Sequence, residues 1–567
     1  MSLGGALNVA SNALNVFSTG IQVTGQNLSN ASTSDYLVQN VNLQAGPTYG
    51  NSPLTLGTGV EATGITTQVD QFLQQQILGA NSDYSSSNQL NSVYTNLQQS
   101  LQALGDSSLS TQFSDFASAL SNLANEPSSD ALNAQAVAAG TSLANSVSSL
   151  NSSLNTQRQD DNNTVQQLVT QANSLIQDIA QLNPQITGLE SNGLSDSQPG
   201  SQLDQMYSDL NQLSQIIPVT YSQNSDGSFS VYSGGNYLVL GTQSQQLQTV
   251  SSSSGGIATL NVQIGSTGQI ITANTPSSGE LSAVLQGRDT VLGGFVQSLN
   301  TLTSNMISSF NQVYASGQGN EAYTSVTSAN TVSDPTAALN QAGLAFTPQN
   351  GSFQLEVTNE NTGLTTTSTI NVNLTGSGSD TTLDSLASEL NGVANVSASV
   401  TADGNLQINA DSNFEIQFSD DSSNVLSALG VNTFFTGSDS SNIGVNQTVV
   451  DNPNTFASGK GSGPSNGSNA LALSQFATNP LAGLGGETLT SNYNALVSGV
   501  ANNASTETTM SQSQDDFLQS LTSQQQQYSG VSLDQQAIKL MQYQEDYQAS
   551  AKVVTTIDSL YQVLMNM

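Results

Sequence analysis

The sequence predicts a mainly α-helical, multidomain, elongated axial protein, in which a long-helix bundle and a terminal coiled coil carry inserted β-rich domains. Three observations predict this class. The chain has 567 residues, too many for a single hydrophobic core, so several domains are expected. Its proline-free stretches repeat apolar residues every three or four positions, which is the spacing of an amphipathic helix. Two shorter stretches alternate apolar and polar residues instead, as half-buried strands do.

The charge balance excludes several classes of partner. The sequence has 40 acidic and 5 basic residues, no His, and a formal net charge of −35. Nucleic acids and anionic lipid surfaces are bound through clustered Lys and Arg side chains, and the sequence has no such cluster. No apolar run reaches the roughly 18 residues that a membrane-spanning helix needs. We therefore expect no nucleic-acid partner and no membrane insertion.

The residue types that most catalytic and metal sites require are missing. Without Cys and His, the chain has no thiolate nucleophile, no Ser–His–Asp triad and no zinc motif. The acidic pair Asp420–Asp421 lacks the alternating oxygen ligands and the glycine of a calcium loop, and we interpret it as a solvated turn. The sequence predicts no catalytic residues, no metal site and no cofactor, and therefore a protein that is not an enzyme.

Residues 1–46 are predicted to form an N-terminal axial helix that pairs with residues 530–567. They contain no proline, and their apolar residues recur at steps of three, four or seven, which places them on one seam of a helix. This seam consists of Leu7, Ala10, Leu14, Phe17, Ile21 and Leu28.

Residues 47–217 are predicted to form a helical-bundle domain. Three apolar stripes with helical spacing support it, at 90–104, 165–182 and 203–217. We expect the prolines to interrupt the helices, because proline removes a backbone donor and clashes with the preceding turn. A small β segment at 218–275 follows, with strands on both sides of an Asp226–Gly227 turn. Residues 276–318 then return to the bundle as one long helix.

Residues 319–457 are predicted to form an inserted β-rich outer domain. Apolar and polar residues alternate at 353–357, 370–374 and 396–418. One helix interrupts the strands, and a capping box between Thr381 and Asp384 would open it. Runs of Gly and Ser predict linkers at Ser191–Gly200, Ser251–Gly256 and Ser458–Asn469. The last of these begins a linker and helical return at 458–529.

Residues 530–567 are predicted to form the C-terminal axial helix. They carry a second apolar seam, made of Leu540, Tyr543, Tyr547, Val554, Ile557, Tyr561 and Leu564. Neither terminal seam can bury itself alone, so we expect the two helices to pack on each other or on neighbouring subunits. In a free monomer both are expected to be disordered.

Both termini resemble the bacterial flagellar rod and hook proteins. At the N-terminus the resemblance rests on residues 6–10, the run QNLSNAST at 26–33 and Tyr36. At the C-terminus it rests on residues 531–534 and the run QYQEDYQASAKV at 542–553. The family has Gly before the signature tyrosine and a basic residue two positions after it, where this chain has Asp35 and Val38. Residues 380–390, 419–423 and 434–438 resemble the variable β region of a hook-associated member.

This resemblance implies a structural role at the junction between hook and filament. A member of this kind is exported through the flagellar type III apparatus without a cleaved signal peptide, and it becomes part of the extracellular flagellum. There it forms a ring homo-oligomer that the filament needs for its assembly. The implied partners are the chain itself, the hook protein, a second junction protein and an export chaperone on the C-terminal helix. The C-terminal tyrosines would serve either that chaperone or the seam between helices.

Two alternatives remain open at the level of sequence. The chain could instead be the hook subunit or the other junction protein, although the long helical stretches argue against the hook subunit. As a different class, it could be a surface adhesin whose activity lies in the β insert. The residues that we expect to make the assembly contacts, by packing alone, are Leu7, Ala10, Leu14, Phe17, Ile21, Leu28, Tyr36, Leu540, Tyr543, Tyr547, Val554, Ile557 and Leu564.

Overall fold

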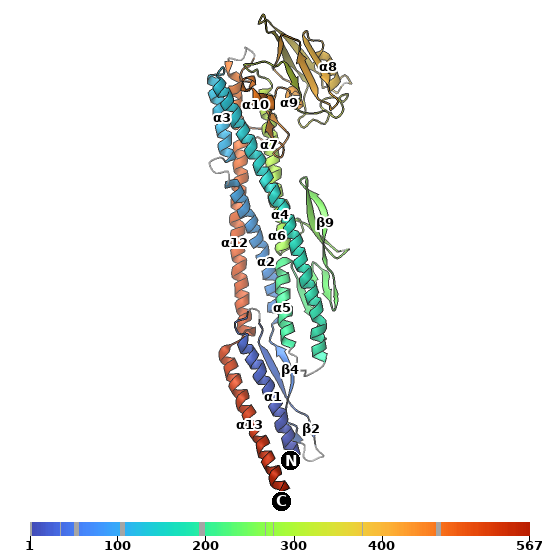
Figure 1. Ribbon diagram of the computed structural model, residues 1–567, viewed down its shortest axis with the longest axis vertical. Helices are drawn as coiled ribbons and strands as arrows, with labels where there is room; N and C mark the ends of the chain where they lie inside the picture. Colours follow the sequence, from blue (N-terminus) through green and yellow to red (C-terminus); the bar gives the residue numbers. More distant parts are fainter. Residues whose placement is uncertain are drawn as a thin grey trace. The chain divides into compact units, whose positions relative to one another are not determined.

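The computed structural model describes residues 3–33, 36–49, 56–102, 108–191, 199–266, 268–275, 277–376, 378–460 and 466–566. Helices hold 55% of the residues and strands 19%, so the predicted fold class, mainly helical with small sheets, is confirmed (Figure 1). The chain divides into two compact units. The first comprises Met1–Val93, Gln159–Thr290 and Ala504–Met567, and the second comprises Tyr94–Arg158 and Val291–Asn503.

The first unit contains the two terminal helices and parts of the longest helices. Several of its helices continue into the sequence of the second unit. The helices are α1 (Leu3–Ser29), α2 (Gln71–Gln102), α4 (Asp130–Ser191), α5 (Pro199–Ile216), α6 (Glu280–Gln286), the π-helix η2 (Gly287–Leu292), α12 (Leu489–Ser529) and α13 (Leu533–Met565). These bounds include the predicted stripe at 165–182, the stripe at 203–217 except Ile217, and residues 90–102 of the stripe at 90–104, whose Leu104 lies outside the described residues.

Proline does not interrupt every helix. Pro184 lies inside α4, so the expectation that prolines bound the helices is wrong at this position. Proline lacks only its own backbone N–H, and the bond that it removes is the one to Ala180 four residues earlier. The Thr187 hydroxyl donates to the Asn183 carbonyl at 3.1 Å, one turn along the same helix. The rest of the hydrogen-bond ladder is therefore sufficient to continue the helix past this residue.

Within the described residues, the strands of the first unit form four small antiparallel sheets. They are β1 (Gln39–Ala45) with β4 (Val60–Thr67), β2 (Thr48–Tyr49) with β3 (Leu56–Gly57), β5 (Thr220–Gln223), β6 (Phe229–Ser233), β7 (Asn236–Leu240) and β8 (Gln243–Ser244) in that order, and β9 (Leu247–Ser254), β10 (Ile257–Ile264) and β11 (Ile270–Ile271) with β10 in the centre. The Asp226–Gly227 turn joins β5 and β6 as predicted.

The predicted linker Ser251–Gly256 is wrong. Its serines belong to β9, where Ser251 pairs with Leu260 of β10, and Gly255 and Gly256 make the hairpin turn. Both glycines have positive φ, which a tight turn requires and glycine allows. A run of serines on an exposed strand needs no apolar alternation, so composition alone suggested a flexible segment. The other two predicted linkers fall partly outside the described residues, at 192–198 and 461–465.

A buried arginine attaches the β9–β11 sheet to the helices of the first unit. Arg288 lies in η2 and is fully buried. Its Nη1 donates to the Leu260 carbonyl at 2.7 Å and to Oδ1 of Asn162 in α4 at 2.8 Å. Its Nε and Nη2 also donate to the Asp289 carboxylate at 3.0 and 2.6 Å. A buried cation is tolerated because its donors are matched in this way.

The second unit combines helices with the inserted strands. Besides parts of α2, α4 and α12, its helices are α3 (Leu109–Asn125), α7 (Gly293–Tyr314), α8 (Leu383–Leu390), α9 (Val425–Leu429), α10 (Gln447–Asp451), the 3-10 helix η3 (Pro453–Thr455), α11 (Ser468–Ser474) and the 3-10 helix η5 (Ala482–Leu484). Its aromatic core brings α3, α7 and residues 434–435 together. Phe116 stacks on Phe310 and on Phe434, with ring centroids 5.3 and 5.6 Å apart.

In the described part of the second unit, the strands form three antiparallel sheets. They are β12 (Ser325–Thr327), β16 (Leu406–Ala410) and β15 (Val396–Val400) in that order, β14 (Thr365–Val372), β13 (Gly351–Asn359) and β17 (Phe414–Ser419) in that order, and β18 (Phe435–Thr436) with β19 (Gly444–Val445). The predicted alternations therefore correspond to strands. The core between the two larger sheets includes Leu355, Ile370 and Leu386.

Two local predictions in this insert are wrong. The capping box of α8 lies one residue later than predicted, between Thr382 and Ser385, because Thr381 instead bonds to the backbone of Asn373 at the edge of β14. Asp421 is also not solvated. It is 7% exposed, and its carboxylate accepts hydrogen bonds from the backbone N–H groups of Ser423 and Leu426 at 2.9 and 3.0 Å. Asp421 therefore caps α9, and burial raises its pKa.

Candidate assembly site at the paired termini

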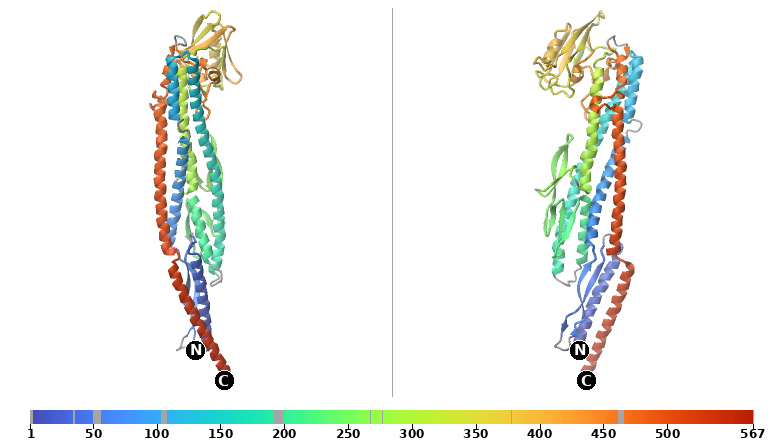
Figure 2. Two further views of the ribbon diagram at one scale, coloured as in Figure 1. Left: turned by 60° about the vertical axis from the view of Figure 1, so that its left-hand side comes forward. Right: turned by 180° about the vertical axis from the view of Figure 1, so that it is seen from behind.

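The two terminal helices lie side by side and run in opposite directions (Figures 1 and 2). Residue numbers rise along α1 while those of its partners fall along α13. A Cβ at Gly4 would lie 3.8 Å from the Tyr561 hydroxyl, and Gly20 lies against the Tyr543 ring. Near the far end of the pair, Asn27 bonds to Gln536. Within one chain, α1 and α13 therefore form an antiparallel helix pair.

A buried asparagine connects three segments at the end of this pair. Asn27 is 1% exposed, and its Nδ2 donates to the Gln39 carbonyl at 2.8 Å and to Oε1 of Gln536 at 3.1 Å. Its Oδ1 accepts from the Tyr36 hydroxyl at 2.9 Å and from the Gln39 N–H at 3.0 Å. All four hydrogen-bonding positions of the amide are therefore used. They tie α1, β1 and α13 to one another.

A glycine allows the two helices to approach closely in the middle of the pair. A Cβ at Gly20 would stand 2.9 Å from two carbons of the Tyr543 ring, which is closer than side chains normally pack. The same ring lies 6.4 Å from that of Phe17, centroid to centroid. The tyrosine of the C-terminal signature therefore fits into a notch of α1 that only glycine leaves open.

The turn between α12 and α13 is attached to the strand pair β1–β4 and the residues next to it. The Val38 N–H donates to the Ser529 carbonyl at 2.8 Å, and the Gln68 side chain donates to the Tyr528 carbonyl at 2.9 Å. Lys539 of α13 donates to Oδ1 of Asn40 at 2.7 Å. Val38 is 6% exposed, so the position where the resembled family has a basic residue is part of the apolar interior here. Asp35 lies outside the described residues.

The electrostatics of this region are set by burial of Asp204 on α5. Burial raises the pKa of the Asp204 carboxyl to about 7, although its Oδ1 accepts a 3.4 Å hydrogen bond from the Leu37 N–H. Burial and the Asp204 charge together raise the pKa of Tyr36 to about 12. Tyr36 therefore stays a neutral hydrogen-bond donor to Asn27 over the ordinary pH range.

The predicted contact residues occupy different environments on the helix pair. Ala10 and Ile557 are buried, at 4% and 5% exposure. The half-buried residues are Leu7, Leu14, Phe17, Ile21, Tyr36, Leu540, Tyr543 and Val554, and the exposed ones are Leu28, Tyr547 and Leu564. The structure brings Phe17 and Tyr543 into contact, and it leaves much of the predicted seam accessible.

Sequence reasoning missed the residues that bury most deeply on α1. Apart from Ala10, these are Val16, Gly20, Val23, Thr24 and Asn27, which form a stripe beside the predicted one. Three of the five are small or polar, so a search for apolar spacing does not find them. The run at 26–33 was a sufficient signal for Asn27, since an asparagine inside a helix needs a hydrogen-bonding reason.

Large apolar side chains remain exposed along α13. Single exposed apolar residues are ordinary, but a dense group on one helix marks an interaction surface. These residues are distributed around the helix and not along one side of it. We use the term outer face of α13 for the surface of this helix that the pair with α1 leaves exposed, and its large apolar members are Leu533, Ile538, Met541, Tyr547, Val553, Leu560, Tyr561, Val563, Leu564 and Met565, which are 39% to 86% exposed.

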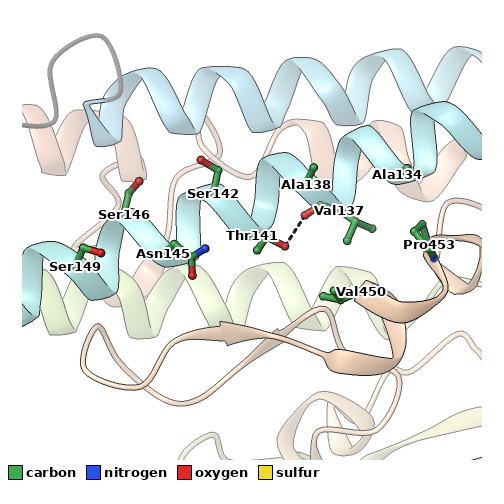
Figure 3. Close-up of a pocket in the computed structure, with 10 residues that line it drawn as sticks. All are labelled: Ala134, Val137, Ala138, Thr141, Ser142, Asn145, Ser146, Ser149, Val450 and Pro453. Carbon is green, nitrogen blue, oxygen red and sulfur yellow. Dashed lines mark hydrogen bonds between the residues drawn. The ribbon is translucent and has the colours of Figure 1, made fainter.

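The second unit carries an open groove, of about 720 Å³, along α4. Figure 3 shows its floor of small side chains, with Val450 and Pro453 on the opposite wall. The Thr141 hydroxyl bonds to the Val137 carbonyl of its own helix at 2.8 Å. The lining residues are Ala134, Val137, Ala138, Thr141, Ser142, Asn145, Ser146, Ser149, Val450 and Pro453. None of these side chains is an acid or a base.

Neither a membrane-spanning helix nor a metal cluster occurs in the part of the chain that the structure describes. No helix there has both the length and the apolar character needed to cross a bilayer. No three Asp or Glu side chains are grouped so that they could hold a metal ion.

Comparison with known proteins gives consistent matches over the whole chain. Residues 94–327 match the family model of the flagellar hook-associated protein FlgK helical domain, and residues 522–567 match that of the flagellar basal body rod FlgEFG protein C-terminal region. The chain is 26% identical to flagellar hook-associated protein 1 of Escherichia coli K12, over 99% of both chains. It is also 26% identical to flagellar hook-associated protein 1 of Salmonella typhimurium, again over 99% of both.

The fold has a counterpart among solved structures. The flagellar hook junction protein FlgK from Burkholderia pseudomallei superposes with a TM-score of 0.54 at 17% identity, covering 80% of this chain and 99% of that one. This likeness concerns the fold. The full-length relatives and the matching helical-domain model assign the chain. The chain belongs to the flagellar hook-associated protein 1 family, whose members are structural proteins of the bacterial flagellum.

Proposed function

We propose that copies of this chain form a ring between hook and filament, and that the filament assembles on this ring. The outer face of α13 carries the proposal, because a helix that is already paired with α1 still presents ten large apolar side chains. In a protein of this family, the apolar terminal helices of neighbouring subunits would pack on this face and cover it. The role is packing, and we propose no enzymatic activity.

The proposed partners follow from the same surface. Neighbouring copies would cover the outer face of α13 within the ring, and the hook protein and a second junction protein would do so above and below it. The half-buried residues Leu7, Leu14 and Ile21 of α1 would complete these contacts. Before assembly, an export chaperone would cover the same face, because an exposed apolar helix in solution promotes aggregation. We propose that the chain reaches the flagellum through the type III apparatus.

The first test is disruption of the gene followed by electron microscopy of the cells. The expected result is hooks of normal length without filaments, with monomeric flagellin in the medium. Cells that lack hooks would assign the chain to the rod or hook instead, and intact motile filaments would contradict a required junction role.

A sharper test separates assembly from folding and export. Leu560→Asp and Val563→Asp each place a charge on the outer face of α13, where the residues are 50% and 58% exposed. Complementation with either variant should yield secreted protein and bare hooks. Gln562→Asp is the matched control, because it adds the same charge at an exposed polar position of the same turn, and it should restore filaments. Equal behaviour of all three variants would contradict the proposed role of the outer face.

A further inference from the structure

The β insert of the second unit has an open sheet edge next to a groove. The edge strand is β14, which among the described strands pairs on one side only, with β13. The groove has a volume of about 510 Å³ and lies between β14 and the turn that follows α8. Its apolar lining includes Val357, Ile370, Val393 and Phe414. A volume of this size is typical of ligand-binding clefts.

The hydrogen-bond pattern fixes which backbone groups of β14 point outward. The Asn359 N–H donates to the Leu364 carbonyl at 3.0 Å, so Leu364 and every second residue after it bond to β13. The alternate residues Thr365, Thr367 and Thr369 direct their N–H and C=O groups away from the sheet. Asn371 confirms this direction, since its outward N–H donates to the Glu389 carboxylate at 3.0 Å.

Side chains satisfy the outward backbone groups at only one end of β14. Glu389 binds the N–H of Asn371, and the Thr381 hydroxyl accepts from the N–H of Asn373 at 2.8 Å. Among the described residues, no backbone or side-chain hydrogen bond reaches the outward backbone groups of Thr365, Thr367 and Thr369. This row of threonines is therefore a template for one more strand.

The register also determines where the side chains of an added strand would go. Thr366 and Ser368 lie opposite Val357 and Leu355 of β13, on the face that covers the core, and both line the groove. Side chains of an added strand would alternate between this groove and the solvent face, because strands have a period of two. The solvent face carries Glu356, which lies opposite Thr367.

Charge identifies the kind of strand that would fit. Residues 319–457 contain fourteen Asp and Glu and no Lys, Arg or His. Glu356, Glu360 and Glu389 lie on β13, in the turn between β13 and β14, and on α8, around the open edge. Long-range attraction therefore favours a cationic partner and disfavours an anionic one.

We propose that β14 binds an extended, basic polypeptide segment as an additional strand, with alternate apolar side chains of that segment in the groove. Backbone hydrogen bonds to Thr365, Thr367 and Thr369 hold the segment, as in other cases of β-strand addition. Apolar side chains pack on Ile370 and Val393, and the intervening basic side chains lie over Glu356. Leu364, which lines the groove and is 72% exposed, covers the end of the segment.

The test uses the full-length protein and a fluorescein-labelled peptide of sequence Lys-Val-Lys-Val-Lys-Val-Lys, followed by fluorescence anisotropy. We expect saturable binding of this peptide. A peptide of the same composition in the order Lys-Lys-Lys-Lys-Val-Val-Val should bind about tenfold more weakly, because it cannot alternate its side chains. Equal binding of the two peptides would reduce the interaction to unspecific charge attraction and overturn the proposal.

A matched pair of proline variants tests the edge itself. Thr367→Pro removes an outward N–H without breaking a bond to β13, and it should weaken binding about tenfold. Thr327→Pro is the control, since Thr327 is also an exposed residue on an edge strand, β12, beside β16. It should leave binding unchanged, and an equal loss in both variants would overturn the assignment to β14.

Hydrogen exchange gives an independent measurement on the same complex. Binding should slow the exchange of the amides of Thr367 and Thr369 and leave those of β12 unchanged. If the free protein instead forms dimers that Thr367→Pro abolishes, and the peptide does not bind, the edge belongs to a second copy of the chain and the proposal is wrong.

Discussion

The side-chain amide of Asn27 donates a 3.1 Å hydrogen bond to Gln536, a residue 509 positions away in the sequence. This contact joins the two terminal helices at the point where β1 also meets α1. Because Asn27 uses both its donor and its acceptor atoms, its replacement would leave several buried polar groups without partners.

Asn27→Ala should therefore destabilise the terminal pair. It leaves the Gln39 backbone groups and the Gln536 side chain unpaired, at about 1–3 kcal/mol for each buried group. Hydrogen exchange of residues 3–29 and 533–565 measures the effect, and exchange should accelerate in both helices together. Asn30→Ala is the control, since the side chain of Asn30 makes local hydrogen bonds, with residues three and four positions away. Similar acceleration in the two variants would contradict the special role of Asn27.

Gly20→Ala should weaken the contact between α1 and α13. A Cβ at this position would lie 2.9 Å from the Tyr543 ring, so the helices must separate. Gly25 lies on the same helix, and a Cβ there would have no described packing neighbour within 4 Å. Gly25→Ala should therefore stabilise the helix by up to about 1 kcal/mol. Urea unfolding curves of the two variants measure the difference. The prediction fails if both alanines stabilise equally.

Acidification should stabilise the region around Asp204. Burial raises the pKa of this carboxyl to about 7 in the folded protein, above its ordinary value of about 3.9 in an unfolded chain. The folded state therefore takes up a proton that the unfolded state releases. The free energy of unfolding should rise as the pH falls from 8 through 7, and the gain should be complete below the unfolded pKa.

Asp204→Asn should reduce this pH dependence, because the amide imitates the protonated carboxyl. Asp226→Asn serves as a control that should leave the slope unchanged. Hydrogen bonds from Ser228 lower the pKa of Asp226, so its contribution to stability is lost only below the ordinary carboxyl pKa of about 3.9, outside the measured range. Thermal unfolding followed by circular dichroism at several pH values between 5 and 8 measures both slopes. An unchanged slope in Asp204→Asn would show that another group is responsible.

Arg288→Met should detach the β9–β11 sheet from α4. The substitution removes the donors to Leu260 and Asn162 and leaves the Asp289 carboxylate without its buried cation, at a cost of about 3–5 kcal/mol. Exchange of the β10 amides should accelerate. The double variant Arg288→Met with Asp289→Leu should recover part of the loss, since no charge then remains unpaired. A double variant less stable than the single one would argue against the ion pair as the cause.

The helices were predictable because their signal is local. Seven apolar positions spaced by three or four between Leu292 and Val313 specify α7 with little help from the rest of the chain. The strands of the insert were equally clear, since Phe353, Leu355 and Val357 alternate with polar residues. The division of the chain into seven sequence segments stays a prediction.

The candidate site was only partly predictable, for physical reasons. Phe17 and Tyr543 were found because they are apolar and regularly spaced. Gly20 and Gln536 were not assigned a contact, because their contributions depend on a partner hundreds of residues away. Asn27 was not assigned one because it is polar, although the run at 26–33 marked its position. The Asp421 cap was missed for a related reason, since an acid next to serines gives the same composition whether it is solvated or buried.

The distance in sequence between Asn27 and Gln536 sets the order of folding. Closing an unstructured loop of that length costs about 5 kcal/mol in chain entropy, so the first helix cannot retain its partner while the intervening chain is unfolded. The contact becomes favourable only after the intervening segments have folded and shortened the effective loop. Pairing of α1 with α13 is thus a late step, and a chain that ends before Gln536 never completes the hydrogen bonds of Asn27. The terminal pair consequently reports whether the chain between Asn27 and Gln536 has been made and has folded.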